Sequence, residues 1–364
     1  MSVTVVVCVL GWIAGWFALG RVRTVDTLRR DGDGRGVRTG LSGVRVIIPA
    51  RDEAHQIGRL LDELCDPDDP TPRPGQVVVV DDHSTDGTAS VATAHDGVQV
   101  VESPPLPEGW TGKSWACATG VHHVVAEGAG ADDVLVFLDA DVRIGRAALA
   151  AIVARRDERG GLVSVQPFHE TRRPYEQLSS LFNVVAVMGT AMGGRRTDPT
   201  GAFGPVLVTS LSDYEQAGGH GAVAAEVVED LALARRYRAA GLRVAAFAGG
   251  ASVRFRMYPR GIAQLAEGWT KNFATGAGAT PLPRLAAIVL WITALGSAAI
   301  TLFDGFVGSA SPTTGLVLYA AFVLQLTLMF GQVGRFGVAT AVLYPVPLLF
   351  FLAVFVHSLW RTHV

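Results

Sequence analysis

The stretch VLVFLDADV, residues 134 to 142, is an apolar run that ends in two aspartates, Asp139 and Asp141. A short apolar run bounded by polar residues is typical of a β-strand that is buried on both faces. Two carboxylates one residue apart point to the same side of an extended chain, and hard divalent cations prefer oxygen ligands of this kind. The stretch therefore predicts a buried strand that brings a pair of acids to one edge of a sheet.

Two other apolar runs also end in acidic clusters. VRVIIP, residues 44 to 49, leads into PARDE, and QVVVVD, residues 76 to 81, leads into DDHSTDGT. Amphipathic segments separate the three runs, and buried strands alternating with helices predict an α/β fold with a mostly parallel sheet. Ligands of such sheets bind beyond the carboxyl ends of the strands, so we expect the three clusters to line one cleft. The alternative is that the polar residues cap helices, and it suits Ser84 and Asp86 best.

The rest of the central region continues the pattern of strands and helices. Apolar runs predict further strands, and periods near 3.6 residues predict helices. We expect strands at residues 98–101, 202–209, 242–248 and 252–257, and helices at residues 54–65, 113–127, 174–192, 223–240 and 259–276.

The chain as a whole is too apolar for an ordinary soluble enzyme. Hydrophobic residues make up 49% of its 364 residues, and the mean hydropathy is +0.33. Uncharged tracts long enough to cross a bilayer occur at residues 3–20, 285–303, 313–333 and 336–360. The first tract lacks a basic segment at its start, which favours an uncleaved anchor over a cleaved signal peptide. We expect an anchor at 1–20, a catalytic domain at 44–275 and three membrane helices within 284–360.

The charged residues and cysteines indicate the compartment. Arg21, Arg23, Arg29 and Arg30 follow the first tract and predict a cytoplasmic position for the central region. The net charge of -2 leaves no basic field for nucleic acid. Three scattered cysteines exclude a disulfide framework and a zinc site, in agreement with a reducing compartment. We therefore expect a multi-pass protein of the cell membrane with a cytoplasmic catalytic domain and no nucleic-acid partner.

The motifs of residues 44–275 resemble those of glycosyltransferase family 2, whose members have the GT-A fold. In addition, the stretch PLPEGWTGKSWACATG and the later GWTKN are similar to the membrane-bound branch that glycosylates carotenoids or hopanoid-like lipids. The resemblance implies a UDP- or GDP-sugar donor, Mg²⁺ or Mn²⁺ as cofactor, and a lipid acceptor. The stretches that carry it are VIIPARDE (46–53), VVVVDDHSTDGT (77–88), GKSWACATG (112–120), FLDADV (137–142) and VVEDLALARRYRAAG (227–241).

The resemblance also implies roles for single residues. The nucleoside pocket would be lined by residues of PARDE, with acids of the second cluster on the base, and Lys113 would lie near the donor phosphates. Asp230 would be the catalytic base of one inverting displacement, supported by Glu229; the alternative is that both acids only stabilise a helix N-terminus. The implied binding residues are Pro49, Arg51, Glu53, Asp81 and Asp82 for the nucleoside, Asp139 for the ribose or metal, and Asp141 as the principal metal ligand.

One motif departs from the pattern of the family. Processive members carry QxxRW, whereas this chain has Gln264 followed five positions later by Trp269, with Gly268 in place of the arginine. This departure favours transfer of a single sugar. Lys271 would replace the missing charge at the diphosphate, and Trp269 would line the substrate site; the alternative is that both anchor a helix at the membrane interface. His220 falls where the family often has an aromatic residue next to the acceptor.

Three hypotheses about function follow. The leading one is a membrane-bound glycosyltransferase that transfers one sugar to a lipid hydroxyl or carboxyl. A polyprenyl-phosphate glycosyltransferase or a polysaccharide synthase would differ in acceptor and product size. A catalytically silent nucleotide-binding membrane protein would be expected to lack one of the acids, yet Asp82, Asp141 and Asp230 are all present.

Overall fold

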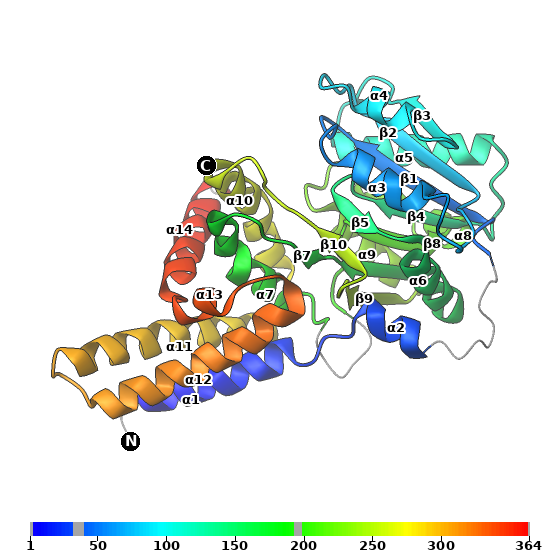
Figure 1. Cartoon of the computed structure of the whole chain (residues 1–364). Helices are drawn as coiled ribbons and strands as arrows, with labels where there is room; N and C mark the ends of the chain where they lie inside the picture. The colour runs from blue at the N-terminus through cyan, green and yellow to red at the C-terminus, as the bar shows by residue number, and fades with distance from the viewer. Residues whose placement is uncertain (1–2, 32–39, 193–198, 363–364) are drawn as a thin grey trace. The chain divides into compact units, whose positions relative to one another are not determined.

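The computed structural model describes residues 3–31, 40–192 and 199–362, which divide into two compact units (Figure 1). The sheet unit comprises residues 23–168 and 201–255. The helical unit comprises the chain up to Val22, residues 169–200 and the chain from Arg256 onward. The predicted linker at residues 31–43 lies mostly outside the described residues.

The sheet unit is built on a seven-stranded sheet in the order β3-β2-β1-β4-β8-β6-β9. All neighbouring pairs are parallel except those of β8, which runs antiparallel to both β4 and β6. A second sheet has the order β5-β10-β7. The strands are β1 Val44–Ala50, β2 Gln76–Asp81, β3 Val98–Glu102, β4 Val134–Leu138, β5 Val142–Ile144, β6 Leu162–Gln166, β7 Phe168–His169, β8 Val206–Ser210, β9 Val244–Ala248 and β10 Val253–Phe255.

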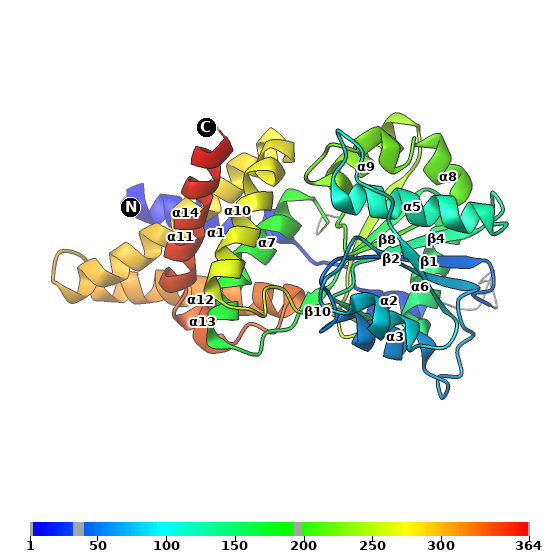
Figure 2. The same ribbon diagram turned by 90° about the horizontal axis from the view of Figure 1, so that it is seen from above.

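Helices cover both faces of the large sheet (Figure 2). One apolar core lies between the sheet and α2, α3 and α6, and a second lies between the opposite face and α5, α8 and α9. The central strands are buried throughout because both faces are covered, which explains their continuous apolar sequences. The helices are α2 Val25–Asp31, α3 Ile57–Cys65, α4 Thr88–Thr93, α5 Gly112–Ala126, α6 Arg146–Arg159, α8 Leu211–Gln216, η2 His220–Val223 and α9 Glu229–Ala239.

The expected α/β architecture with a mostly parallel sheet is confirmed, and two details differ. The expected helix at 223–240 begins only at Glu229, because the chain before it forms the short 3-10 turn η2 that buries His220. The predictions also left out α6 and β6, although β6 lies inside the sheet between β8 and β9. The strand LVSVQ carries a serine and a glutamine among few apolar residues, so its pattern is weak.

Three long apolar helices lie side by side in the helical unit: α1 Val3–Leu19, α11 Leu282–Phe306 and α12 Pro312–Val333 (Figure 1). A Cβ added to Gly11 of α1 would lie 2.2 Å from the Cβ of Ala294 in α11, so α1 and α11 approach closely. The buried Gln325 of α12 joins all three helices. Its Nε2 donates to the carbonyl of Trp12 at 2.7 Å, and its Oε1 accepts from the indole of Trp291 at 2.9 Å.

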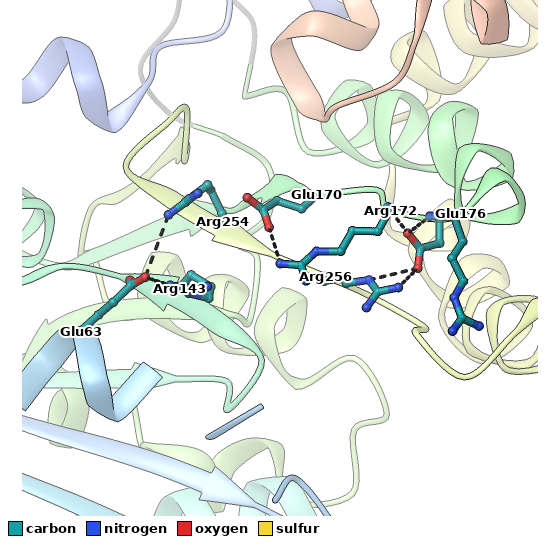
Figure 3. Close-up of polar contacts among 8 residues, drawn as sticks. Glu63, Arg143, Glu170, Arg172, Glu176, Arg254 and Arg256 are labelled. Atoms are coloured by element: carbon teal, nitrogen blue, oxygen red, sulfur yellow. Dashed lines mark hydrogen bonds and ion pairs between the residues drawn. The ribbon is translucent and has the colours of Figure 1, made fainter. Parts of the chain in front are cut away.

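The helical unit also contains η1 Pro174–Ser179, α7 Ser180–Gly189, α10 Ile262–Ala279, α13 Val338–Val342 and α14 Pro345–Thr362. Glu176 fixes the start of η1, because its fully buried carboxylate binds the Arg256 side chain and accepts backbone N–H groups of Arg172 and Arg173 (Figure 3). The apolar tract at 336–360 is not one helix: it breaks between α13 and α14, where Pro345 begins the second helix.

Two described helices, α11 and α12, are long and apolar enough to cross a membrane. Two others, Val3–Leu19 and Pro345–Trp360, are apolar but shorter. These helices fall at the positions of the four uncharged tracts in the sequence.

Candidate active site

The acidic clusters do meet at one edge of the large sheet. In the parallel register Ala50 of β1 lies beside Asp81 of β2, and Ile47 lies beside Phe137 of β4. Since the three strands run in the same direction, their carboxyl ends present PARDE, DDHSTDGT and DAD together. Pro49 is the penultimate residue of β1, and Asp139 directly follows the end of β4.

The loops after β1 and β2 interlock through hydrogen bonds. The N–H of Asp52 donates to Ser84 Oγ at 3.0 Å, and the N–H of Thr85 donates back to Asp52 Oδ1 at 2.8 Å. Glu53 is held by a bond from its N–H to Thr88 Oγ1 at 2.9 Å. Ser84 therefore bridges the two loops and does not cap α4. Asp86 also bridges the loops, because its Oδ2 accepts from the N–H of Ala54 and its Oδ1 accepts from that of Thr88, but the N-cap of α4 is Gly87.

Asp82 lies between the loop after β1 and the start of α5. It is 7% exposed, and its Oδ2 is 3.5 Å from a guanidinium nitrogen of the exposed Arg51. A Cβ on Gly112, the first residue of α5, would lie 2.6 Å from the same oxygen, so the position has room only for glycine. Asp82 is thus a fixed acceptor at the N-terminus of a helix, a place that favours negative charge.

Lys113 connects Asp139 of the DAD cluster with Glu229 at the start of α9. Its Nζ lies 2.8 Å from Asp139 Oδ1 and 3.0 Å from Glu229 Oε1. Burial alone would lower the pKa of Lys113, but the two carboxylates outweigh it and hold that pKa well above its ordinary value. In turn, burial would raise the pKa of Glu229, and Lys113 keeps it below the ordinary value. Lys113 is therefore a fixed positive charge at the sheet edge, and 37% of its side chain is exposed.

Asp141 has the charge environment of a cation ligand. Burial raises its pKa to about 8, and the negative charges of Asp139 and Glu53 add to the effect. The strand that follows is anchored, because the Arg143 guanidinium donates to Glu63 of α3 through Nε at 2.8 Å (Figure 3). A buried carboxylate beside two other acids gains stability from a divalent ion.

The donor set fits a metal that is only partly ligated by protein. Among the described residues, no three His, Cys, Asp or Glu side chains form a ready-made metal cluster. Mg²⁺ characteristically takes one or two carboxylates and completes its shell with water and substrate phosphates. Asp139 and Asp141 match that pattern.

Asp230 is held in one orientation by two backbone donors. Its Oδ2 accepts from the N–H of Gly204 at 2.6 Å, and its Oδ1 accepts from the N–H of Leu231 at 2.8 Å. Burial raises the pKa of Asp230 to about 7; Glu229 adds to the shift and Lys113 opposes it. A carboxylate with a pKa near the working pH is suited to accept a proton during a reaction.

His220 is enclosed beneath the edge. It is 1% exposed, its Nδ1 is 2.9 Å from the hydroxyl of Tyr214, and its ring packs edge-on against Phe137. Burial lowers its pKa to about 4, so the imidazole is neutral near pH 7.

Trp269 and Lys271 belong to the helical unit. Trp269 is 6% exposed, donates from Nε1 to Ser179 Oγ at 3.1 Å and stacks on Phe182. Its ring is enclosed by protein, and the place predicted for it in the substrate site stays a prediction. Lys271 is exposed. Gly268 is fixed by packing, because a Cβ there would lie 2.1 Å from the ring of Tyr258.

Sequence reasoning did not identify two glycines of the site. Gly112 lies against Asp82, and Gly204 donates to Asp230. Gly112 is the first residue of α5 and belongs to the motif GKSWACATG, whereas Gly204 lies just before β8 and outside the motifs. No sequence pattern showed that either glycine lies against a carboxylate.

Comparison with known families gives two overlapping matches. Residues 45–200 match the family model described as Glycosyl transferase family 2, and residues 124–364 match that of Glycosyl transferase family 21.

Curated relatives align over most of the chain. The 4,4'-diaponeurosporenoate glycosyltransferase of Staphylococcus aureus strain MRSA252 is 37% identical over 329 residues, covering 87% of this chain and 84% of the relative. The same protein from strain USA300 gives the same identity and coverage.

A solved structure shares the fold over its whole length. It is described as the mannosyltransferase PcManGT from Pyrobaculum calidifontis in complex with GDP-Man and Mn²⁺. The TM-score is 0.54 with 21% identity, and the match covers 99% of both chains. This likeness shows the GT-A arrangement of the sheet.

Proposed function

The chain belongs to glycosyltransferase family 2, and we propose that it is a metal-dependent, inverting enzyme that transfers one sugar from a UDP- or GDP-sugar to a carotenoid-like lipid. The observation that carries the chemistry is the pair of contacts from Lys113 to Asp139 and Glu229, with Asp230 as the next residue in the chain. The pair joins the acids at the end of β4 to the start of α9. Support for the acceptor comes from the relatives named for diaponeurosporenoate.

The proposed donor site follows the sheet edge. Asp82, with Asp81, would accept hydrogen bonds from the nucleobase, and the loop with Pro49, Arg51 and Glu53 would enclose the nucleoside. Lys113 would face the diphosphate, since its amine is partly exposed and always charged. A divalent ion held by Asp139 and Asp141, Mg²⁺ or Mn²⁺, would neutralise negative charge on the diphosphate.

In the proposed reaction Asp230 accepts the proton of the acceptor. Each of its oxygens receives one backbone N–H and keeps a lone pair, so the carboxylate can still take a proton. The acceptor oxygen forms a bond to the anomeric carbon as the bond from that carbon to the diphosphate breaks. The nucleoside diphosphate leaves on the opposite side, which inverts the anomeric configuration.

The geometry disfavours a polysaccharide synthase. An arginine at position 268, where QxxRW would place it, cannot fit while Tyr258 keeps its position. Lys271 is exposed, and its role as a replacement for the arginine charge stays a prediction. Trp269 would act through its packing on Phe182 and Ser179, which holds α10 in place.

We further propose a multi-pass protein of the cell membrane with its catalytic domain at residues 44–275 on the cytoplasmic side. The apolar helices α11 and α12 support membrane insertion. The contacts of Gln325 with Trp12 and Trp291 support a retained α1, because removing this helix would leave a buried amide without one of its partners. The exposed arginine after α1, Arg21, supports the orientation.

The deciding experiment is a transfer assay with detergent-purified full-length protein. It would be incubated with UDP- and GDP-sugars, Mg²⁺ or Mn²⁺, and lipids that include 4,4'-diaponeurosporenoate and a hydroxylated carotenoid. Mass spectrometry should find a lipid heavier by one sugar residue, and the Asp230→Asn variant should form far less of the hydroxyl-linked product. Polymer products would favour a synthase, and sugar on a polyprenyl phosphate would favour that alternative. A wild-type protein that binds nucleotide sugars but modifies no lipid would contradict the proposal.

A further inference from the structure

We propose that residues Phe203–Pro205, which we call the strap, position the base and the donor-side acid relative to each other, and that Ser164 anchors the strap. This inference rests on the proposed role of Asp230. The strap immediately precedes β8. Its residues Phe203, Gly204 and Pro205 form hydrogen bonds with Ser164, Asp230 and Asp139, respectively.

Ser164 is the anchor in the core. It lies in the middle of β6 and is fully buried, a position where an apolar residue would be expected. Its Oγ accepts from the N–H of Phe203 at 2.6 Å and donates to the carbonyl of Phe203 at 3.0 Å. A buried hydroxyl lowers stability unless it is hydrogen-bonded. Here one hydroxyl satisfies both backbone groups of one strap residue and so fixes its orientation.

Gly204 is the contact with the base. Its N–H donates to Asp230 Oδ2. A Cβ at this position would lie 3.1 Å from Lys113 Nζ and 3.3 Å from Asp230 Oδ2, both tighter than ordinary contact distances. The backbone of Gly204 is not in the left-handed region, so a methyl group here would crowd Lys113 and Asp230 without straining the backbone. It thus lies between the amine and the carboxylate.

Pro205 is the contact with the donor side. Its carbonyl accepts from the N–H of Asp139 at 3.0 Å. The next residue, Val206, pairs with Leu138 in the antiparallel ladder of β8 and β4. The strap is therefore held at both ends, by Ser164 in β6 and by the ladder to β4. The separation of Asp139 from Asp230 is set by three consecutive residues.

This arrangement predicts an effect on turnover that is separate from binding of the nucleoside. The proposed nucleoside contacts come from the loops after β1 and β2, which the strap does not touch in any contact described above. Displacing a reacting group by about 1 Å can lower a rate by roughly 10²-fold. Loosening the strap should therefore reduce kcat more than it weakens nucleoside affinity.

The test compares three variants with a matched control in the full-length protein. Ser164→Ala removes both anchoring bonds, Ser164→Thr keeps the hydroxyl, and Gly204→Ala adds a methyl group beside Lys113 and Asp230. The control is Ser180→Ala, because Ser180 is equally buried but its hydroxyl has no hydrogen-bond partner in the described part of the chain. Turnover is measured with the donor and acceptor found active in the panel, and affinity with the corresponding nucleoside, which lacks the diphosphate that Lys113 and Asp139 would face.

We expect Ser164→Ala and Gly204→Ala to lower kcat about 10-fold to 100-fold while the dissociation constant of the nucleoside changes less than about threefold. Ser164→Thr should retain most of the turnover, and Ser180→Ala should match the wild type. Unchanged kcat in both Ser164→Ala and Gly204→Ala would overturn the inference. Equal losses in Ser164→Ala and Ser180→Ala would also overturn it, because the cause would then be general destabilisation.

Hydrogen exchange separates this inference from the proposed function. In Ser164→Ala the amides of Phe203, Gly204, Val206 and Asp139 should exchange at least tenfold faster than in the wild type, with no such change in Ser180→Ala. A wild type that transfers no sugar would refute the proposed function, and the exchange rates would still decide whether Ser164 anchors the strap. Unchanged exchange would show that it does not.

Discussion

Replacing Asp230 by asparagine should reduce turnover and stabilise the protein at the same time. The carboxylate is buried beside Glu229, and its pKa is raised from 3.8 to about 7. Asparagine cannot accept a proton from the substrate, so transfer to a hydroxyl should slow by roughly 10²-fold to 10⁴-fold. Transfer to a carboxylate acceptor should slow much less, because such an acceptor is already ionised near neutral pH.

The effect on stability depends on pH. Because the native pKa of Asp230 exceeds the unfolded value, its native form binds the proton more tightly, and the ionised side chain destabilises the fold progressively as pH rises from about 4 to 7. A shift of about three units corresponds to roughly 4 kcal/mol above pH 7. Asparagine removes this penalty. It also has only one oxygen for the N–H groups of Gly204 and Leu231, which costs about 1 to 3 kcal/mol.

The net gain for Asp230→Asn above pH 7 is therefore about 1 to 3 kcal/mol, and it should shrink and change sign as pH falls toward 5. Thermal or denaturant unfolding in detergent at pH 5 and pH 8 measures it, and steady-state transfer measures the loss of turnover. For the wild type, kcat/KM with a hydroxyl acceptor should fall about tenfold from its plateau to pH 6, with a midpoint near pH 7. Near-normal turnover of the variant with a hydroxyl acceptor, or a stability difference that does not depend on pH, would refute the reasoning.

Three other predictions follow from the structure. Asp141→Ala should abolish transfer, and a chelator should silence the wild type until Mg²⁺ or Mn²⁺ is restored; full activity in excess chelator would exclude a metal. A reporter placed in the 31–43 linker should be cytoplasmic and one in the 304–312 loop external, so reporters on one side would require another topology. Gln325→Leu should lower stability in detergent by about 1 to 2 kcal/mol, because it removes the partner of the Trp12 carbonyl and of the Trp291 indole N–H. An unchanged melting temperature would show that the Gln325 amide does not hold the three helices together.

The sequence by itself determined the fold class and the main acids of the site. Strands buried on both faces must be apolar throughout, and their ends must return to polar residues, so VRVIIP, QVVVVD and VLVFL mark three strands of the sheet with little ambiguity. Because parallel strands end at the same edge, the convergence of PARDE, DDHSTDGT and DAD also followed from the pattern. The apolar tracts of the helices that are long enough to cross a membrane are local properties of the same kind.

Only the tertiary structure decided contacts between residues that are distant in sequence. The residues next to Lys113 in the sequence do not show that its amine contacts both Asp139 and Glu229. Trp269 is buried because it packs on Phe182 and Ser179 from other helices. The residue type alone did not predict this burial. The position of β6 depends on pairing with β8 and β9, and a strand's own residues do not specify its neighbours.

The two glycines show the physical reason most clearly. At 112 an oxygen of Asp82 occupies the space that a side chain would need, and at 204 an added methyl group would crowd Lys113 and Asp230. Local propensity acts over a few residues, whereas the space available at a site is set by whatever the fold brings there. The motifs therefore show which residue types take part in the proposed reaction. The packing of β6, β8 and the strap sets the distances between these residues.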